Sequence, residues 1–185
     1  TSKLAIASSF FIAADVTGDY RSVSAGPSNW TTLSSWQYYD GSNWITPTPA
    51  IGYPGELTAA NSVKIQAGHT INIASNLTSS KTLGSVTING NLTLNPSNTN
   101  SPLILNTLEL NISGGNVNFN LNKTRLNLPT GAGITIDNGG SISATTCTNN
   151  DEIYIGTTKY AVCAGAPGPV YTFGEVTTAG GNLNA

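Results

Sequence analysis

The stretch SVTINGNLTL (residues 85–94) decides the fold. It consists of two short segments, SVTI (85–88) and NLTL (91–94), in which polar and apolar residues alternate, separated by Asn-Gly. Alternation with a period of two is typical of a β-strand that has one buried face. The same alternation of polar and apolar residues occurs on both sides of this stretch, in VKI (63–65), HTINI (69–73), TLEL (107–110), NVNF (116–119), RLNL (125–128), ITID (134–137) and SISA (141–144).

The alternating segments recur at a nearly constant step. Successive pairs open at Val63, Ser85 and Thr107, each 22 residues after the last, and another pair opens near Arg125. A repeat of about 20 residues that is built of short strands predicts a solenoid, in which each coil contributes two or three strands. We therefore predict an all-β, single-domain, right-handed parallel β-helix. Its coils should bury Ile65, Ile71, Ile73, Val86, Ile88, Leu92, Leu94, Leu108, Leu110, Val117, Phe119, Leu126, Leu128, Ile134, Ile136 and Ile142.

A β-sandwich is the alternative, because it is also made of short strands with turns every 8–12 residues. The repeat favours the β-helix, and so do the asparagines at the predicted turns. Their side-chain amides can stack between coils and satisfy backbone groups. These residues are Asn72, Asn89, Asn95, Asn111 and Asn138.

The composition excludes several classes of partner. Charged residues make up 9% of the 185 residues and the net charge is −2, so no basic patch exists for nucleic acid or for anionic lipid. No stretch reaches the roughly 18 apolar residues of a membrane span. Asn, Thr, Ser and Gly supply the polarity instead of charge.

The two cysteines, Cys147 and Cys163, have no histidine or further cysteine near them. A structural zinc site needs four ligands, usually in close pairs. We therefore predict a disulfide between them, which implies an oxidising, extracellular or cell-surface location.

All three tryptophans lie in NWTTLSSWQYYDGSNWITP (29–47), directly before the first repeat. An open end of a solenoid must be covered, and large aromatic side chains can cover it. We expect Trp30, Trp36 and Tyr53 to form this cap, and Tyr38, Tyr39 or Trp44 to be exposed to a ligand such as a sugar. Asp40-Gly41 predicts a two-residue hairpin loop, in which Tyr39 would pair with Ser42 and Gln37 with Trp44.

Catalytic chemistry has little support in the sequence. The nine acidic residues are scattered, and only Asp151 and Glu152 are adjacent. His69 is the only histidine, and we expect its ring to bond the local backbone at a turn. Asn149, Asn150 and Asp151 could offer oxygen atoms to calcium, but they also suit a hairpin turn. We predict no catalytic residues, no metal and no cofactor.

Residues 18–73 resemble the opening of many exported surface proteins of Bacteroidota. The matching residues are Tyr20, Arg21, Ser22, Asn29, Trp30, Trp36, Trp44, Gly52, Tyr53, Pro54, Gly55, Gly68, His69 and Thr70. The downstream segments CTNNDEIYIGTTKYAVC and YTFGEVTTAGG are also similar to segments of these proteins. The resemblance implies a β-helix module of the type IX secretion pathway, as in adhesins of gliding bacteria, whereas residues 1–17 match nothing in it.

These observations predict an apolar extension (1–17), an aromatic capping region (18–60) and β-helix repeats with the disulfide loop (61–185). The extension either folds back over the first coil or is donated to a neighbouring subunit. The predicted function is that of a non-catalytic cell-surface structural or adhesion module, an adhesin or a filament subunit. Its partners would be other surface-protein domains, copies of itself or glycans. The alternative is a carbohydrate-binding or polysaccharide-degrading β-helix domain.

Overall fold

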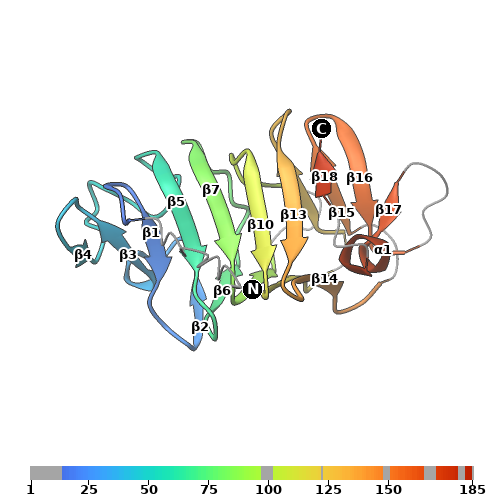
Figure 1. Cartoon of the computed structure of the whole chain (residues 1–185), viewed down its shortest axis with the longest axis horizontal. Coiled ribbons are helices and arrows are strands. Elements are labelled where there is room, and N and C mark those ends of the chain that lie inside the picture. Colours follow the sequence, from blue (N-terminus) through green and yellow to red (C-terminus); the bar gives the residue numbers. More distant parts are fainter. Residues whose placement is uncertain are drawn as a thin grey trace, which may run out of the picture.

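The computed structural model describes residues 14–96, 102–121, 123–147, 151–164, 170–178 and 182–184. In these ranges the chain winds into a β-solenoid of about four turns (Figure 1). Each complete coil contributes a strand to three parallel sheets, here called sheets A, B and C. The prediction of a parallel β-helix is therefore confirmed, and the β-sandwich is excluded.

Sheet A contains one strand from each coil, and these strands are β5 (Ala60–Ile65), β7 (Leu83–Ile88), β10 (Glu109–Ser113) and β13 (Gly133–Asp137). The sheet continues beyond both outer coils. On the N-terminal side follow β1 (Tyr20–Ser22), β3 (Trp36–Tyr39) and β4 (Trp44–Ile45), and on the C-terminal side follows β18 (Asn182–Asn184).

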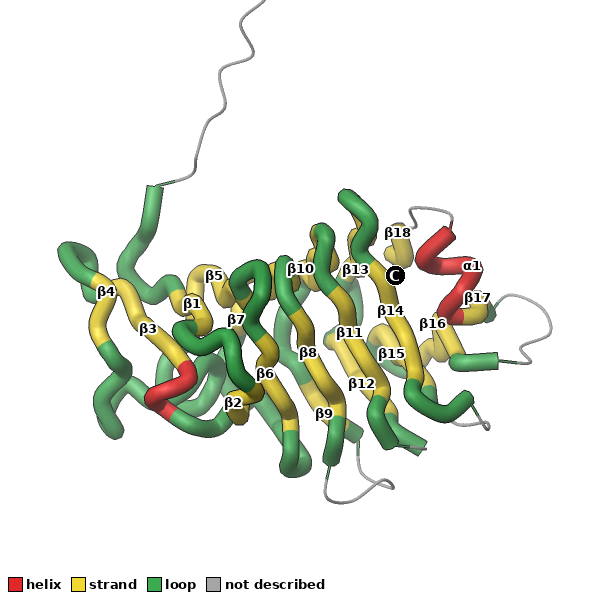
Figure 2. Tube along the Cα trace, turned by 90° about the horizontal axis from the view of Figure 1, so that it is seen from below, coloured by secondary structure: helices red, strands yellow, loops and turns green. Residues whose placement is uncertain are grey.

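Sheet B contains β2 (Pro27–Asn29), β6 (Thr70–Ile73), β8 (Asn91–Leu94), β11 (Asn116–Phe119) and β14 (Ser141–Ala144), which run side by side in Figure 2. Sheet C contains β9 (Leu103–Ile104), β12 (Arg125–Leu128), β15 (Glu152–Ile155), β16 (Thr158–Val162) and β17 (Tyr171–Thr172). Two short helices complete the described elements, the 3-10 helix η1 (Leu33–Ser35) and α1 (Phe173–Thr178).

The core lies inside the coils, because alternate side chains of every strand point inward. In sheet A, Val63 pairs with Val86, Val86 with Leu110 and Leu110 with Ile134, and all four are buried. The predicted 22-residue equivalence was therefore slightly wrong, since Ser85 pairs with Ser62. Coils are 23 or 24 residues apart in this sheet.

The predicted core residues are buried with one exception, Leu108, of which 51% is exposed. The hydroxyl of the buried Thr107 donates to the backbone oxygen of Glu109, so the chain bends just before β10 and turns Leu108 outward. Further buried core residues outside the predicted set lie in sheet C or beside its strands, namely Leu77, Leu103, Leu105, Ile153 and Ile155.

The corner between sheets A and B is built on glycine. A Cβ atom on Gly90 would lie 2.3 Å from the backbone oxygen of His69, and one on Gly115 would lie 2.4 Å from that of Gly90. Successive coils can approach this closely only because these residues have no side chain.

Both outer coils are closed by antiparallel strands. At one end β3 pairs with β1, and at the other β18 pairs with β13. Residues 14–17 are exposed, whereas residues 1–13, on which the fate of the predicted extension depends, lie outside the described residues.

Candidate functional site

The predicted capping tryptophans fill the N-terminal end of the core. Trp30 and Trp36 are fully buried, and their rings meet edge to face with centroids 5.0 Å apart. The indole nitrogen of Trp36 donates to the backbone oxygen of Trp30 (2.7 Å), and that of Trp30 donates to the backbone oxygen of Pro54 (3.1 Å). Tyr53 is half-buried against the same core, and burial raises the pKa of its hydroxyl. Both indoles thus place their apolar rings inside and satisfy their polar atoms.

The hairpin between β3 and β4 has a longer loop than expected. Tyr39 pairs with Trp44 and Tyr38 with Ile45, so the predicted pairing of Gln37 with Trp44 was wrong. The Oδ1 atom of Asp40 accepts hydrogen bonds from the backbone nitrogen atoms of Ser42 and Asn43. This side chain stabilises a wider turn than a two-residue loop allows.

The three aromatic residues that we expected to face a ligand lie on two sides of this hairpin. Tyr38 packs against the buried Tyr20, with ring centroids 5.2 Å apart. Tyr39 and Trp44 point outward, but the Arg21 guanidinium lies 4.1 Å from the centroid of the Trp44 ring. The Trp44 indole nitrogen donates to Asp15. Arg21 therefore occupies a face of Trp44 on which a sugar ring would stack.

We predicted that the His69 ring bonds the local backbone, and this prediction was wrong. The Nδ1 atom of His69 lies 2.8 Å from the hydroxyl oxygen of Ser22, which is distant in sequence. That oxygen also accepts the backbone N–H of Gln66 (2.9 Å), and the direction of its bond to His69 depends on the tautomer of the ring. Ser22 is fully buried and out of reach of a substrate, so the pair fixes a turn rather than forming a nucleophile with its base.

A polar hollow of about 570 Å³ lies beside this turn, at the corner between sheets A and B. It is lined by Lys64, Gln66, Ala67, His69, Asn89, Ser113 and Gly114. A smaller hollow of about 140 Å³ adjoins it and shares Lys64 and Gln66; it also contains Asp15, Asp19, Arg21 and Trp44. Four charged side chains of this weakly charged chain, those of Asp15, Asp19, Arg21 and Lys64, line the smaller hollow.

Sequence reasoning missed the larger hollow, although the turn lengths could have indicated it. The corner turn covers Gln66–His69 in the first coil, but only Asn89–Gly90 and Gly114–Gly115 in the next two. In the fourth coil it lengthens again to Asn138–Gly140. Two short turns between two longer ones leave a depression.

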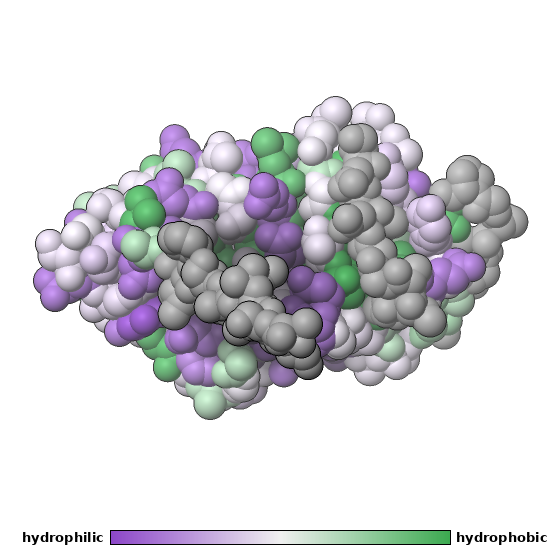
Figure 3. Space-filling view, in the orientation of Figure 1, coloured by the Kyte–Doolittle hydropathy of each residue, from purple (hydrophilic) through white to green (hydrophobic). Residues whose placement is uncertain are grey.

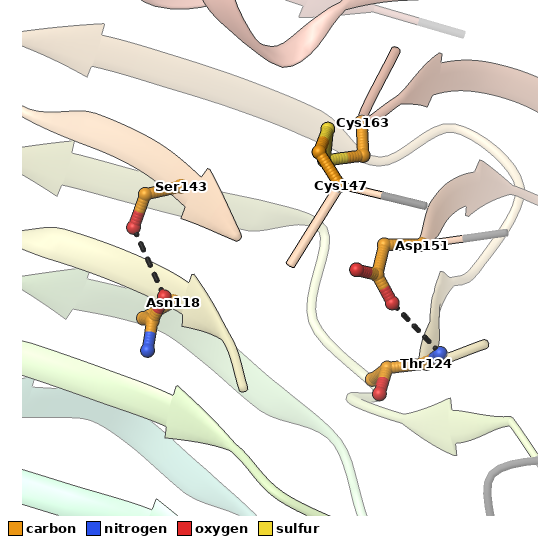
Figure 4. The surroundings of a disulfide bond; sticks show 6 residues. All are labelled: Asn118, Thr124, Ser143, Cys147, Asp151 and Cys163. Atoms are coloured by element: carbon orange, nitrogen blue, oxygen red, sulfur yellow. Dashed lines mark hydrogen bonds between the residues drawn. A yellow bond between two sulfur atoms is a disulfide. The ribbon is translucent and has the colours of Figure 1, made fainter. Parts of the chain in front are cut away.

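The outer face of sheet B is an uncharged polar array. The outward side chains of its strands and strand ends are Thr70, Asn72, Asn91, Thr93, Asn95, Asn116, Asn118, Asn120, Ser141, Ser143 and Thr145. Many of them bond to each other between coils, as Ser143 does to Asn118 (3.1 Å, Figure 4) and Thr145 to Asn120 (3.1 Å). Asparagine side chains therefore bond between coils, but mainly to hydroxyls on the strands of sheet B. Of the predicted turn asparagines, Asn89 donates to the backbone oxygen of Ser113 and Asn138 to the Ser113 hydroxyl.

The face seen in Figure 3 is also mainly polar, with hydrophobic side chains in separate small patches. On sheet C, Glu152 forms ion pairs with Arg125 (3.4 Å) and Lys159 (2.5 Å). The hydrogen bond to Glu152 raises the pKa of Lys159. The Arg125 guanidinium lies 4.2 Å from the centroid of the Tyr154 ring.

The predicted disulfide between Cys147 and Cys163 is present and lies at the C-terminal end of the solenoid (Figure 4). Asp151 lies in the loop that it closes; its carboxylate is buried and accepts the backbone N–H of Thr124 (3.0 Å). Burial raises the pKa of this carboxyl group, although the hydrogen bond from Thr124 lowers it. Asn149 and Asn150, the other calcium ligands considered, lie outside the described residues.

In the parts of the chain that the structure describes, no three metal-ligating side chains cluster. Among the same residues, no helix is long and apolar enough to cross a membrane. No protein-family model, curated protein or solved structure matches the chain. The class that its geometry defines is that of a disulfide-bridged parallel β-helix.

Proposed function

We propose that the chain is a non-catalytic structural and adhesive module of an exported bacterial surface protein. The observation that carries this proposal is the outer face of sheet B. It presents in-register rows of amides and hydroxyls on a rigid support, and it carries no charged side chain on the outward positions of β6, β8, β11 and β14. Such a face suits contact with another hydroxyl-rich, uncharged surface.

Three further features support the proposal. The resemblance of residues 18–73 to exported surface proteins of Bacteroidota suggests the compartment and the type IX pathway. The disulfide fits an oxidising environment. In sheet A antiparallel strands follow both outer coils, which disfavours continuation of its parallel stacking into a copy of the chain and favours contacts along the sides of the solenoid.

Beads coated with the oxidised chain test the adhesive role when they are passed under flow over a surface coated with neutral dextran. We expect retention, and we expect Asn118→Lys combined with Ser143→Lys to reduce it severalfold, because two ammonium groups must then be desolvated at the contact. These two residues are cross-strand neighbours on sheet B.

The matched control is Asn111→Lys combined with Thr135→Lys. This pair occupies the same two coils and the same cross-strand relation on sheet A. Equal retention of both double variants would contradict a role for sheet B, and release of shortened chains from the dextran would contradict a non-catalytic function.

A further inference from the structure

The corner hollow is a wide, open depression in the surface of the solenoid. Its volume of about 570 Å³ lies within the range of small-ligand sites, roughly 300–1,000 Å³. Backbone forms part of the surroundings, since Gly114 lines the hollow and the neighbouring Gly90 and Gly115 cannot carry a Cβ atom. The wall beside β1 is fixed by the bonds of His69 and Gln66 to Ser22.

Lys64 and His69, which line the hollow, offer hydrogen-bond donors. Lys64 is exposed on β5, and its ammonium group forms no ion pair or hydrogen bond with any of the described residues. In the tautomer in which His69 Nδ1 accepts the Ser22 hydroxyl hydrogen, Nε2 carries the ring hydrogen and is a second donor. A cation and an N–H donor together suit a carboxylate.

Two side-chain amides that line the hollow, those of Gln66 and Asn89, offer acceptors. The amide nitrogen of Gln66 donates to the backbone oxygen of Ser22 (2.5 Å), and that of Asn89 donates to the backbone oxygen of Ser113 (2.8 Å). These bonds fix the orientation of both amides. Their side-chain oxygen atoms have no partner among the described residues, and they can therefore accept hydrogen bonds from ligand hydroxyls.

This pattern selects among ligand classes. A divalent cation would be repelled by Lys64, and an apolar ligand would find no aromatic wall among the lining residues. A phosphate group is favoured by an arginine fork or by several charged donors, whereas one lysine lines this hollow. A ligand with one carboxylate and several hydroxyl groups matches both the donors and the acceptors that line the hollow.

We propose that the corner hollow binds a carboxylated sugar residue of an acidic polysaccharide. The carboxylate lies against Lys64 and the Nε2 hydrogen of His69, and the hydroxyls donate to the amide oxygens of Gln66 and Asn89. The carboxylates of Asp15 and Asp19 line the adjoining hollow and are already engaged by Trp44, Ser62 and the backbone of Val16. The site is separate from the sheet B face and does not depend on the proposed adhesion.

Titration of the full oxidised chain with a short galacturonate oligosaccharide, followed by amide chemical shifts, tests the proposal. We expect saturable shifts at Gln66–His69, Asn89 and Gly114, and no such shifts with the methyl ester of the same oligosaccharide, which lacks the charge. Lys64→Gln should weaken binding about tenfold or more, since hydrogen bonds to charged groups are the stronger ones. Lys81→Gln, at an exposed lysine outside the hollow, is the matched control and should leave affinity unchanged.

A second pair of variants avoids residues that hold the fold together. Ala67 lines the hollow and is exposed, so Ala67→Glu should abolish galacturonate binding by charge repulsion, whereas Ala67→Gln should largely retain it. Equal binding of the methyl ester, equal effects of the two lysine variants, or an absence of shifts overturns the proposal. An oligoglutamate peptide that binds as tightly as galacturonate would also overturn it, since the site would then recognise an acidic peptide. Bead retention by sheet B is unaffected in either case.

Discussion

Both ends of the solenoid must cover exposed core, and they do so with different side chains and bonds. Each end must cover an exposed layer of core and the unpaired edges of three sheets. The N-terminal end uses bulk, since Trp30 and Trp36 are fully buried and stacked edge to face, with Tyr20 beside them. Their polar atoms bond to the backbone of the same end.

The C-terminal end uses smaller side chains and a covalent bond. Helix α1 packs on β14 and places Phe173 and Val176 against the core, with the Phe173 ring 4.9 Å from that of Phe119. The disulfide joins the chain after β14 to the end of β16, and the buried carboxylate of Asp151 lies in the loop that it closes. One end is therefore held mainly by burial, and the other mainly by restriction of the unfolded chain.

Removal of a buried indole should have the largest effect. Trp36→Ala should lower the free energy of unfolding by about 3–5 kcal/mol, because it leaves a large cavity and removes the donor to Trp30. Chemical denaturation followed by circular dichroism measures this difference. Trp44→Ala in the same hairpin is the control and should cost clearly less, because Trp44 is partly exposed. Similar costs for the two variants would contradict a capping role for Trp36.

Reduction of the disulfide should have the next largest effect. Cys147 and Cys163 are 16 residues apart, for which the chain-entropy estimate gives about 3 kcal/mol of stabilisation. We expect this loss in denaturation experiments on the Cys147→Ser, Cys163→Ser double variant. Hydrogen exchange should show it as faster exchange in β14–β16, with unchanged protection in β1 and β3. If the double variant instead lost protection from hydrogen exchange first in β1 and β3, the disulfide would not act mainly on the C-terminal end, and the proposed difference between the two ends would be contradicted.

The comparison also shows what a sequence reveals about each end. Burial of Trp30 and Trp36 was predictable, because such large apolar side chains placed directly before a repeat have few other uses. The disulfide was predictable because the chain offers only one pair of cysteines. Helix α1 was not predictable, since YTFGEVTT has no helical periodicity and its order depends on the surface of β14 beneath it.

Register was harder to predict than fold. The alternation in SVTI and NLTL identified strands, but a constant step from Val63 to Ser85 placed the two coils one residue out of register. The step from Gly90 to Gly115 to Gly140 reflects the corner more faithfully, because only glycine fits where successive backbones touch. Likewise, Asp40-Gly41 indicated a turn, while the two bonds of the Asp40 side chain decided its length. The corner hollow depends on the different lengths of the corner turns in successive coils. A search for repeated segments looks for what the coils share and does not reveal such differences.

Asp151 should produce the smallest effect, and one that is specific to the C-terminal end. Burial raises the pKa of its carboxyl group above the ordinary value of 3.8, so the folded state binds this proton more tightly than the unfolded state does. The resulting stabilisation is complete below that ordinary value and is lost as the pH rises through the raised pKa of the folded state.

Asp151→Asn, which keeps an oxygen acceptor for Thr124, should remove this dependence. The stability difference between the wild type and Asp151→Asn should therefore move in favour of the wild type as the pH falls from 7 towards about 3.5. Denaturant titrations across this range measure it, with Asp137→Asn, at an exposed aspartate, as the control. A difference that moves in the opposite direction would mean that the Thr124 hydrogen bond outweighs desolvation at this carboxyl group.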